Sequence, residues 1–430
     1  MVMQTSVSTK AFKSYLFFWS GQLFSLLGSS IIQFTLIWWI VDTTGSAIYL
    51  SIAAFSATIP MVIIPLIAGV FIDRWNRKIT IALTDSLQAL ITFFLIIMFV
   101  MNIADVWIVI LLNFLRGICQ AIHYPTVNAI IPIMIPKKHL SRMNGINYLF
   151  TGLIQVVGPI IAAPLLLFLT IEEILWADII TFIIAVIPLI LVKIPSISNN
   201  IDGLKRKSFF KEFKFSMSIM KTIPGFLVLI VFISVINLLN MPFNILMPLF
   251  VKKIHSGGPV EFAIVMASFQ AGIVFGAIIA SVKKTWANKE LIILLSVLIG
   301  FSGYLIATLA PKSNFLIISV GRLIHACMIP IANTMFLTIL QTKVQPEAQG
   351  KVFSLAIVIS SAVTPIGMII AGPLAETIGI VLFFIICLAL QIICLIITWV
   401  FTDIRHVISN EKKIRAQENT EKENDLSLIS

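Results

Sequence analysis

Twelve long apolar runs constrain this chain more than any other feature of its sequence. Each run covers 21 to 29 residues, which is enough for a helix to cross roughly 30 Å of hydrocarbon. Backbone amides in lipid must be satisfied within their own segment, and runs of this length are too long for barrel strands, so we expect helices. The expected spans are 14–41, 47–72, 79–102, 106–134, 143–168, 171–193, 224–251, 261–282, 290–310, 315–340, 352–373 and 378–401.

The composition agrees with a membrane protein. Hydrophobic residues make up 59% of the 430 residues and charged residues only 11%, a balance outside the range of soluble domains. The first span follows a short polar segment and lacks a small-residue cleavage pattern, so we expect a retained helix and not a signal peptide. The four cysteines all fall inside expected spans without metal-type spacing, which predicts core residues and no metal site.

The positions of the cations predict the orientation in the bilayer. If the N-terminus is cytoplasmic, 25 of the 30 Lys and Arg residues lie on that side and three on the other, with Arg116 and Arg322 inside spans. The positive-inside rule then places both termini in the cytoplasm. We expect the membrane to be the plasma membrane. Basic loops beside an anionic leaflet explain the net charge of +11, so no nucleic-acid partner is expected.

The two halves of the chain resemble one another, which indicates a duplication. Spans four and ten share three residues at an offset of 205, namely Ala121 with Ala326, Pro125 with Pro330 and Asn128 with Asn333. We predict four parts: a six-helix bundle at 1–193, a cytoplasmic linker with an amphipathic helix at 194–222, a second six-helix bundle at 223–402 and a disordered cytoplasmic tail at 403–430. Two pseudo-symmetric six-helix bundles are typical of alternating-access transporters.

The loop GVFIDRWNRK between spans two and three carries a family signature. Its residues Gly69, Asp73, Arg74, Arg77 and Lys78 match the pattern G-x-x-x-D-R-x-x-R-K of the major facilitator superfamily. The stretches WSGQLFSLLGSSI, TGSA, PTVNAIIP and GKVFSL are similar to the macrolide-efflux branch, whose members also resemble siderophore exporters. The resemblance covers all twelve spans but not the tail, and it implies the major facilitator fold and a proton-driven exporter.

The same loop is a candidate conformational latch. Gly69 allows close helix approach, while Asp73 and Arg77 are placed to bond across the cytoplasmic end and to face helix termini. Such contacts would hold the bundles together on the cytoplasmic side in the outward-facing state and break when the bundles rock apart. The alternative is a positive loop that only sets topology. The second-half counterpart has Ala280 where the acid would be, which predicts a weaker latch there.

Ionisable residues inside spans are candidates for proton coupling, because a charge in hydrocarbon is costly and usually faces a cavity or a partner. Arg116 lies near the midplane of span four, and its pairing with Gly117 matches a superfamily position implicated in coupling. Asp178, Asp85 and His123 are the other candidates. For each residue a structural role remains open: helix packing for Asp178, the loop latch for Asp85, and a hydrogen-bonded packing residue for His123.

Polar residues of the other spans are candidates for lining a central cavity. With few embedded carboxylates, we expect recognition to depend on apolar and aromatic surface with sparse hydrogen bonds, which suits bulky amphipathic substrates. Arg322 could balance substrate charge or pair with an acid. The candidates are Gln33, Asn128, Asn237, Asn240, Asn244, Arg322, His325 and Asn333.

Span five contains GLIQVVGPIIAAP, a partial match to the antiporter signature G-x-x-x-G-P-x-x-G-G. Gly158 and Pro159 fit, but the first glycine lies six positions earlier and alanines precede Pro164 in place of the closing glycines. The small residues predict close contact with the partner bundle, and ordinary kinked packing is the equal alternative.

No phosphate-loop or zinc-hydrolase motif occurs, so we expect neither an enzyme nor a cofactor, and transport must be secondary. The leading hypothesis is proton-coupled export of macrolide-like small molecules by a monomer that contacts only substrate, protons and lipid. The alternatives are a siderophore, lipid or metabolite transporter of the same fold, including an importer, and a membrane sensor or scaffold that transports nothing.

Overall fold

The computed structural model describes residues 9–72, 75–194, 209–223, 225–283, 286 and 288–402 of the chain. Within these residues the secondary structure is helical and contains no strand, and twelve helical segments are long and apolar enough to cross a membrane. The prediction of twelve spanning helices is therefore confirmed, and the chain is a multi-pass membrane protein.

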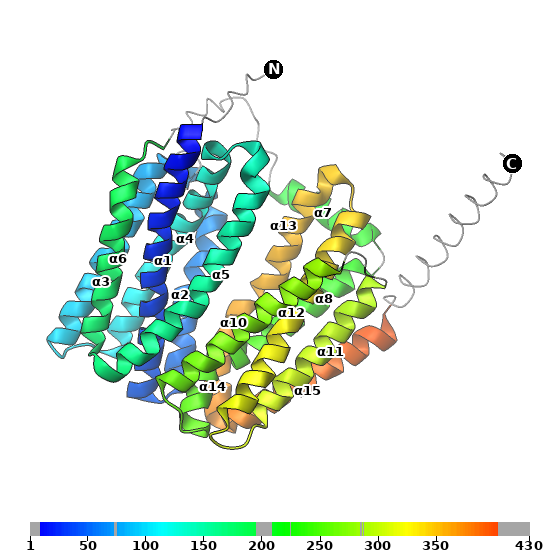
Figure 1. Cartoon of the computed structure of the whole chain (residues 1–430). Helices are drawn as coiled ribbons and strands as arrows, with labels where there is room; N and C mark the ends of the chain where they lie inside the picture. The colour runs from blue at the N-terminus through cyan, green and yellow to red at the C-terminus, as the bar shows by residue number, and fades with distance from the viewer. Residues whose placement is uncertain are drawn as a thin grey trace, which may run out of the picture.

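The first six helices form one bundle, shown in blue to green in Figure 1. Several begin or end beyond the apolar run, because polar residues continue a helix where it leaves the hydrocarbon. Their bounds are α1 Thr9–Thr44, α2 Ala47–Ile72, α3 Arg77–Val100, α4 Val106–Met134, α5 Lys137–Phe168 and α6 Ile171–Leu191.

The second bundle contains two spans that the structure divides. Span seven, predicted as one run over 224–251, is broken into α8, α9 and η1, and span eleven is broken at Val363 into α13 and α14. Pro248 and Pro365 lie in the first turns of α9 and α14, where the missing N–H is tolerated. The bounds are α8 Phe226–Ile245, α9 Met247–Leu249, η1 Phe250–Ile254, α10 Pro259–Val282, α11 Lys289–Thr308, α12 Phe315–Lys343, α13 Pro346–Ala362, α14 Thr364–Ile378 and α15 Ile380–Phe401.

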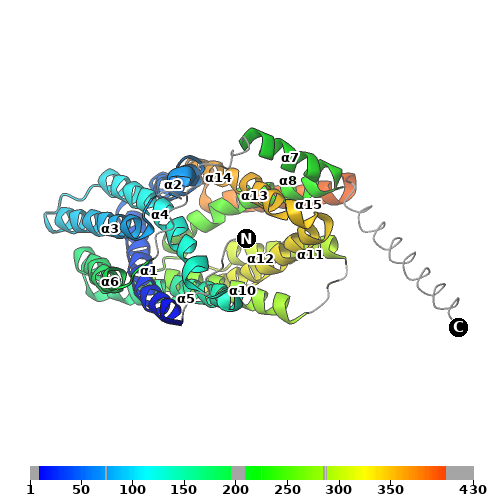
Figure 2. The ribbon, with the colours of Figure 1, turned by 90° about the horizontal axis from the view of Figure 1, so that it is seen from above.

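The segment between the bundles contains α7, Phe209–Thr222, which lies along the surface of the second bundle against α8 and α13 (Figures 1 and 2). This helix falls inside the predicted linker 194–222. Residues 195–208 of that linker, and the predicted tail 403–430, lie outside the described residues.

The two bundles meet mainly through two helix pairs, α2 with α14 and α5 with α10, which lie side by side in both views (Figures 1 and 2). We call the end at which α1 begins the terminal end and the end with the α1–α2 turn the turn end. In Figure 1 the bundles converge at the turn end and diverge toward the terminal end. Aromatic stacking supports the junction, because the ring of Phe262 on α10 lies 5.2 Å from Phe34 and 6.0 Å from Trp38 on α1.

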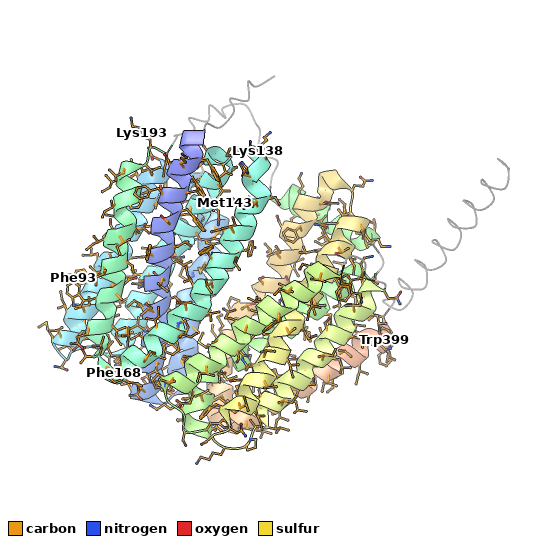
Figure 3. All side chains as sticks on the ribbon, viewed as in Figure 1. Phe93, Lys138, Met143, Phe168, Lys193 and Trp399 are labelled. Carbon is orange, nitrogen blue, oxygen red and sulfur yellow. The ribbon has the colours of Figure 1, made fainter. Side chains whose placement is uncertain are left out.

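The outer surface of the bundles is apolar. Phe93 and Phe168 are 42% and 84% exposed, and Figure 3 shows them projecting from the first bundle, while Lys138 and Lys193 lie at its terminal end. An exposed apolar belt of this extent is expected for a surface that faces lipid. The membrane assignment therefore rests on the exposed side chains as well as on helix length.

Candidate functional site

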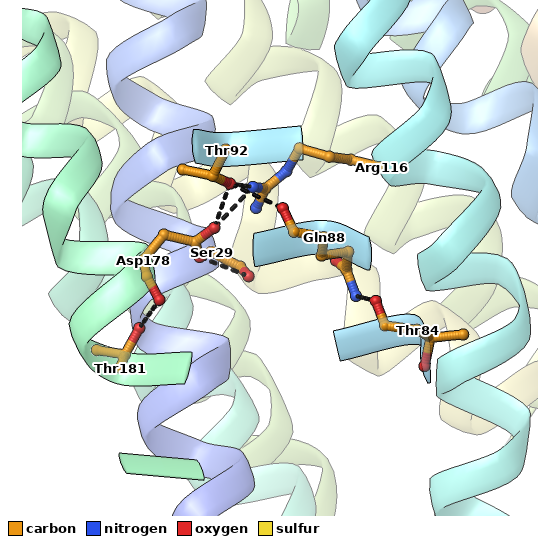
Figure 4. A network of polar contacts seen from close by, with 7 residues as sticks. All are labelled: Ser29, Thr84, Gln88, Thr92, Arg116, Asp178 and Thr181. Carbon is orange, nitrogen blue, oxygen red and sulfur yellow. Dashed lines mark hydrogen bonds and ion pairs between the residues drawn. The ribbon is translucent and has the colours of Figure 1, made fainter. Parts of the chain in front are cut away.

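A buried ion pair in the first bundle joins two of the predicted coupling residues. Nη1 of Arg116 on α4 lies 2.7 Å from Oδ2 of Asp178 on α6, and the two side chains are 8% and 7% exposed. Figure 4 shows both side chains pointing toward α3, where Thr92 donates a 2.6 Å hydrogen bond to the same carboxylate oxygen and contacts Arg116. Ser29 of α1 donates to the second oxygen at 3.4 Å.

Local packing orients Arg116. The next residue is Gly117, where an added Cβ would lie 2.7 Å from the carbonyl oxygen of Ala57, so α4 can lie this close to α2 only with glycine at that position. With this face of α4 against α2, the preceding arginine is directed to α3 and α6. The residue pair that carried the family resemblance therefore has a physical reason in the packing.

The two charges of the ion pair depend on one another. Two desolvated charges are stable only together, and removing one partner of a buried pair typically costs about 3–5 kcal/mol. Without the Asp178 carboxylate, the buried guanidinium would have only hydroxyl and amide neighbours. The pair therefore joins α4 to α6 inside the first bundle.

A second buried cluster brings together the other two coupling candidates. Nε2 of His123 on α4 lies 3.0 Å from Oδ1 of Asp85 on α3 and 3.0 Å from Oε1 of Gln22 on α1. Gln22 also donates to the other Asp85 oxygen at 3.3 Å, and Asp85 is only 4% exposed. The described partners of Asp85 all lie within the first bundle. These contacts do not support the alternative role of Asp85 in the loop latch.

One face of α3 serves both clusters. Asp85, Gln88 and Thr92 are spaced by three and four residues, which places them on the same side of a helix. The sequence analysis did not name Thr92, Gln22 or Ser29. The spacing of polar residues along α3 could have indicated that Thr92 lies on the same face as Asp85 and Gln88. Nothing in the sequence around Gln22 and Ser29 on α1 indicated a functional position.

A cavity of about 260 Å³ lies beside the ion pair. Its wall includes Gln33, a predicted cavity residue, and Arg116 itself. The other polar residues of the wall are Ser29, Ser30, Gln88, Asn113, Gln120 and Gln155. Amide side chains both donate and accept hydrogen bonds, so this cavity can hold water or a polar group next to the charged pair.

The second bundle holds a more apolar cavity of about 230 Å³. Its apolar wall includes Phe232, Phe301 and Met328. Five predicted cavity residues line it, namely Asn237, Asn240, Asn244, His325 and Asn333. Apolar walls with a few convergent polar groups are typical of sites for organic ligands.

The remaining predicted residues lie elsewhere. Arg322 is buried behind the second cavity, where its Nη1 donates to Asn244 at 3.1 Å. Asn128 is half-buried on α4 and lines neither cavity. Gly158 does not make the predicted contact with the partner bundle: an added Cβ would lie 2.6 Å from Cβ of Ser30 on α1 of the same bundle. The adjoining Pro159 is buried, whereas Pro164 is exposed.

The loop signature is only partly described. Asp73 and Arg74 lie outside the described residues, and Gly69 lies in α2. Lys78 donates to the carbonyl oxygens of Ile190 at 2.7 Å and Val192 at 2.9 Å, so it caps the end of α6 within its own bundle. Arg77 begins α3, and its Nη1 is buried without a hydrogen-bond partner among the described residues.

Charged contacts between the bundles occur at the turn end, at residues that the sequence analysis did not single out. Nζ of Lys252 on η1 lies 2.5 Å from Oδ1 of Asp42, near the end of α1. Glu376 on α14 accepts a 3.2 Å hydrogen bond from the backbone N–H of Ile48 and another from the hydroxyl of Ser46. A cation at a helix C-terminus and an anion at a helix N-terminus both complement the helix dipole.

Comparisons with known proteins agree with this architecture. The family model of the Major Facilitator Superfamily matches residues 18–311. Macrolide efflux protein A of Streptococcus pyogenes is 29% identical over 369 residues, covering 84% of this chain and 89% of the relative. The staphyloferrin A transporter of Staphylococcus aureus is 24% identical over 413 residues, covering 94% and 98%.

The structure of the nucleoside transporter NupG superposes with a TM-score of 0.67 at 13% identity, covering 88% of this chain and 98% of that one. This likeness shows the fold of two six-helix bundles. The superfamily and these relatives are transporters. The match to the family model extends over more than half of the chain and confirms the prediction from the loop signature: the chain belongs to the major facilitator superfamily and resembles its macrolide-efflux branch.

Proposed function

We propose that this protein exports hydrophobic or amphipathic small molecules, macrolide-like compounds among them, in exchange for protons. It would act as a monomer in the plasma membrane, with both termini in the cytoplasm. The relatives support the substrate class, because macrolide efflux protein A matches most of the chain. The alternative is export of a siderophore, which the staphyloferrin A transporter favours.

The orientation follows from the positive-inside rule applied to the structure. The basic residues at the starts of α3 and α5 lie at the terminal end, which makes that end cytoplasmic and the turn end external. The described charged contacts between the bundles would then lie on the external side. The structure would correspond to an inward-facing state, from which substrate is taken up for export.

The Arg116–Asp178 pair carries the proposal of proton coupling. Its buried carboxylate is balanced by a single guanidinium, and the guanidinium lines a polar cavity. A proton that enters from the external side would neutralise Asp178 and separate the pair. Its release to the cytoplasm would restore the pair, so one cycle of the bundles would carry protons inward and substrate outward.

The test uses everted membrane vesicles, in which respiration acidifies the interior. We expect uptake of radiolabelled erythromycin that collapses when a protonophore is added. The variant Asp178→Asn should lose the response to the proton gradient. The matched control is Asp105→Asn, because Asp105 caps α4 through the N–H of Trp107 at 2.8 Å and Asn is an equally good cap. Uptake that does not respond to the protonophore, for wild type, would refute proton-coupled export.

A further inference from the structure

Arg322 is a buried cation without an acidic partner among the described residues. It lies on α12 and is 5% exposed, and its Nη1 donates to Oδ1 of Asn244 at 3.1 Å. Its guanidinium carbon lies 4.2 Å from the ring centre of Phe269 and 4.8 Å from that of Phe243. Its Nε is buried and makes no hydrogen bond to a described residue. A guanidinium has five donors, so this arrangement leaves donor capacity unused.

Comparison of the two bundles shows that Arg322 lacks an acidic partner of the kind that Arg116 has. Arg322 on α12 lies one residue from the position that the offset of 205 assigns to Arg116, and α15, the last helix of the second bundle as α6 is of the first, contains no acidic residue. The second bundle therefore keeps a buried cation in its fourth span and has no acid in its sixth. Buried charges are normally paired, so the guanidinium of the second bundle lacks the counter-charge that the first bundle has.

The described acids of the second bundle do not supply this counter-charge. Glu261 accepts a hydrogen bond from the N–H of Gly258 at the start of its own helix, and Glu376 bonds to α2 of the first bundle. Glu290 lies in the first turn of α11, and its Oε2 is buried without a partner. No described ion pair includes Arg322.

A second donor without a described partner belongs to Tyr304, which packs against the same Phe243 ring. The ring of Tyr304 on α11 stacks on Phe243 with centroids 3.8 Å apart, and the Tyr304 hydroxyl is buried without a hydrogen-bond partner among the described residues. Phe243 thus contacts both Arg322 and Tyr304. Two donors without described partners that pack against one ring favour a ligand that carries only acceptors, as a carboxylate does.

The site adjoins the cavity of the second bundle. Asn244 lines that cavity and is the residue to which Arg322 donates. A carboxylate oxygen that took the place of the Asn244 amide oxygen would meet the guanidinium directly. The aromatic wall at Phe232 and Phe301 would hold an apolar body attached to that carboxylate.

We propose that Arg322, with Asn244 and Tyr304, binds the carboxylate of an amphipathic organic anion in the cavity of the second bundle. This inference rests on the proposed function and names amphipathic carboxylates as a further substrate class of the same transporter. The guanidinium supplies the charge and the directed donors, and the cavity wall supplies the apolar contact.

The test measures binding of a matched pair of fluorescent probes, 1-pyrenebutanoate and 1-pyrenebutanamide, to the purified full-length protein in a buffer free of chloride and of carboxylates. We expect wild type to bind the carboxylate about tenfold more tightly than the amide. Arg322→Gln should lose this preference while Arg322→Lys keeps part of it, with thermal unfolding as the check on folding. The control Lys312→Gln removes an exposed cation from the turn after α11 and should keep the full preference.

Three outcomes decide the proposal. Equal binding of the two probes by wild type would overturn it without any variant, and so would a loss of preference in Lys312→Gln equal to that in Arg322→Gln. Loss of the preference when sodium chloride is added would assign the site to small inorganic anions and overturn the carboxylate. If the wild type exports erythromycin but binds the two probes equally, only this inference is refuted. If the wild type prefers the carboxylate probe but exports nothing in the vesicle assay, only the proposed function is refuted.

Discussion

The contact of Glu376 with the start of α2 should control how often the turn end opens. Glu376 belongs to α14 of the second bundle, yet its carboxylate accepts hydrogen bonds from the N–H of Ile48 at 3.2 Å and from the hydroxyl of Ser46. One bundle therefore caps a helix of the other. The cap exists only while the bundles are closed at this end, so its free energy adds directly to the closed state.

The magnitude follows from the chemistry of helix caps. Loss of a side-chain cap costs about 0.5–2 kcal/mol, and a carboxylate at a helix N-terminus contributes about 0.3–1 kcal/mol through the dipole. These two effects overlap, and Glu376 is exposed to solvent, so we expect about 1 kcal/mol for Glu376→Gln. Since 1.4 kcal/mol corresponds to a factor of ten, the ratio of closed to open turn ends should fall by about fivefold.

Spin-label distances would measure this shift. Met101 and Leu309 are 61% and 57% exposed at the turn end of the two bundles, and labels there would separate when that end opens. The background would lack the four native cysteines. Glu376→Gln should increase the long-distance population, whereas Glu173→Gln should not. Glu173 is a matched control because its carboxylate accepts from the N–H of Thr170 at 2.9 Å and so caps its own helix α6.

The reasoning fails if Glu376→Gln leaves the distance distribution of wild type unchanged. It also fails if Glu173→Gln produces the same shift, because loss of any helix cap would then suffice. The measurement has to be made at low and at high salt, since a partly exposed carboxylate is screened by ions. A shift that shrinks with salt supports the dipole contribution.

Three further predictions concern other contacts. Arg116→Met or Asp178→Leu alone should lower the free energy of unfolding by about 3–5 kcal/mol, and the double variant should regain most of the lost stability. Chemical denaturation measures these values. Losses that simply add in the double variant would exclude a coupled pair. Gly372→Leu should open the turn end, because a Cβ at this position would lie 2.7 Å from the backbone of α2. The control Gly152→Leu should leave the spin-label distances unchanged, because an added Cβ there has nothing within 4 Å. A Gly372→Leu variant whose turn end stays closed would contradict this prediction. Lys78→Met should cost about 1 kcal/mol of thermal stability by uncapping α6, and unchanged stability would show that those bonds contribute nothing.

Hydropathy and one loop signature were sufficient to predict the architecture. Twelve apolar runs each became a spanning segment, because lipid forces a backbone to satisfy its own hydrogen bonds. The breaks in spans seven and eleven were not predicted, although Pro248 and Pro365 mark them. Proline is common inside spanning helices, and Pro60, Pro65 and Pro125 interrupt nothing, so its presence does not tell a break from a tolerated kink.

The candidate site was predictable as residues but not as pairs. Arg116 and Asp178 were each identified by the cost of a charge in hydrocarbon, yet their contact joins helices that are 62 residues apart in the chain. Pairing depends on the rotation of each helix about its axis, and a uniformly apolar helix has no amphipathic face that would indicate this rotation. The contacts of Glu376 were missed for a similar reason, because hydropathy places a residue at the end of a span and does not name its neighbour across the bundle interface.

The unequal chemistry of the two bundles has a consequence for coupling. The described buried charge pairs lie in the first bundle, and the apolar cavity with its asparagines lies in the second. If protons act on one and substrate on the other, neither ligand can influence the other except through the surfaces where the bundles meet, chiefly α2 with α14 and α5 with α10. A change at Glu376 touches neither cavity, yet it changes the free energy that both ligands must overcome to open the turn end. We therefore expect Glu376→Gln to alter the proton dependence of export in vesicles while binding of substrate to the inward-facing state stays the same, and an unaltered proton dependence would show that coupling is confined to one bundle.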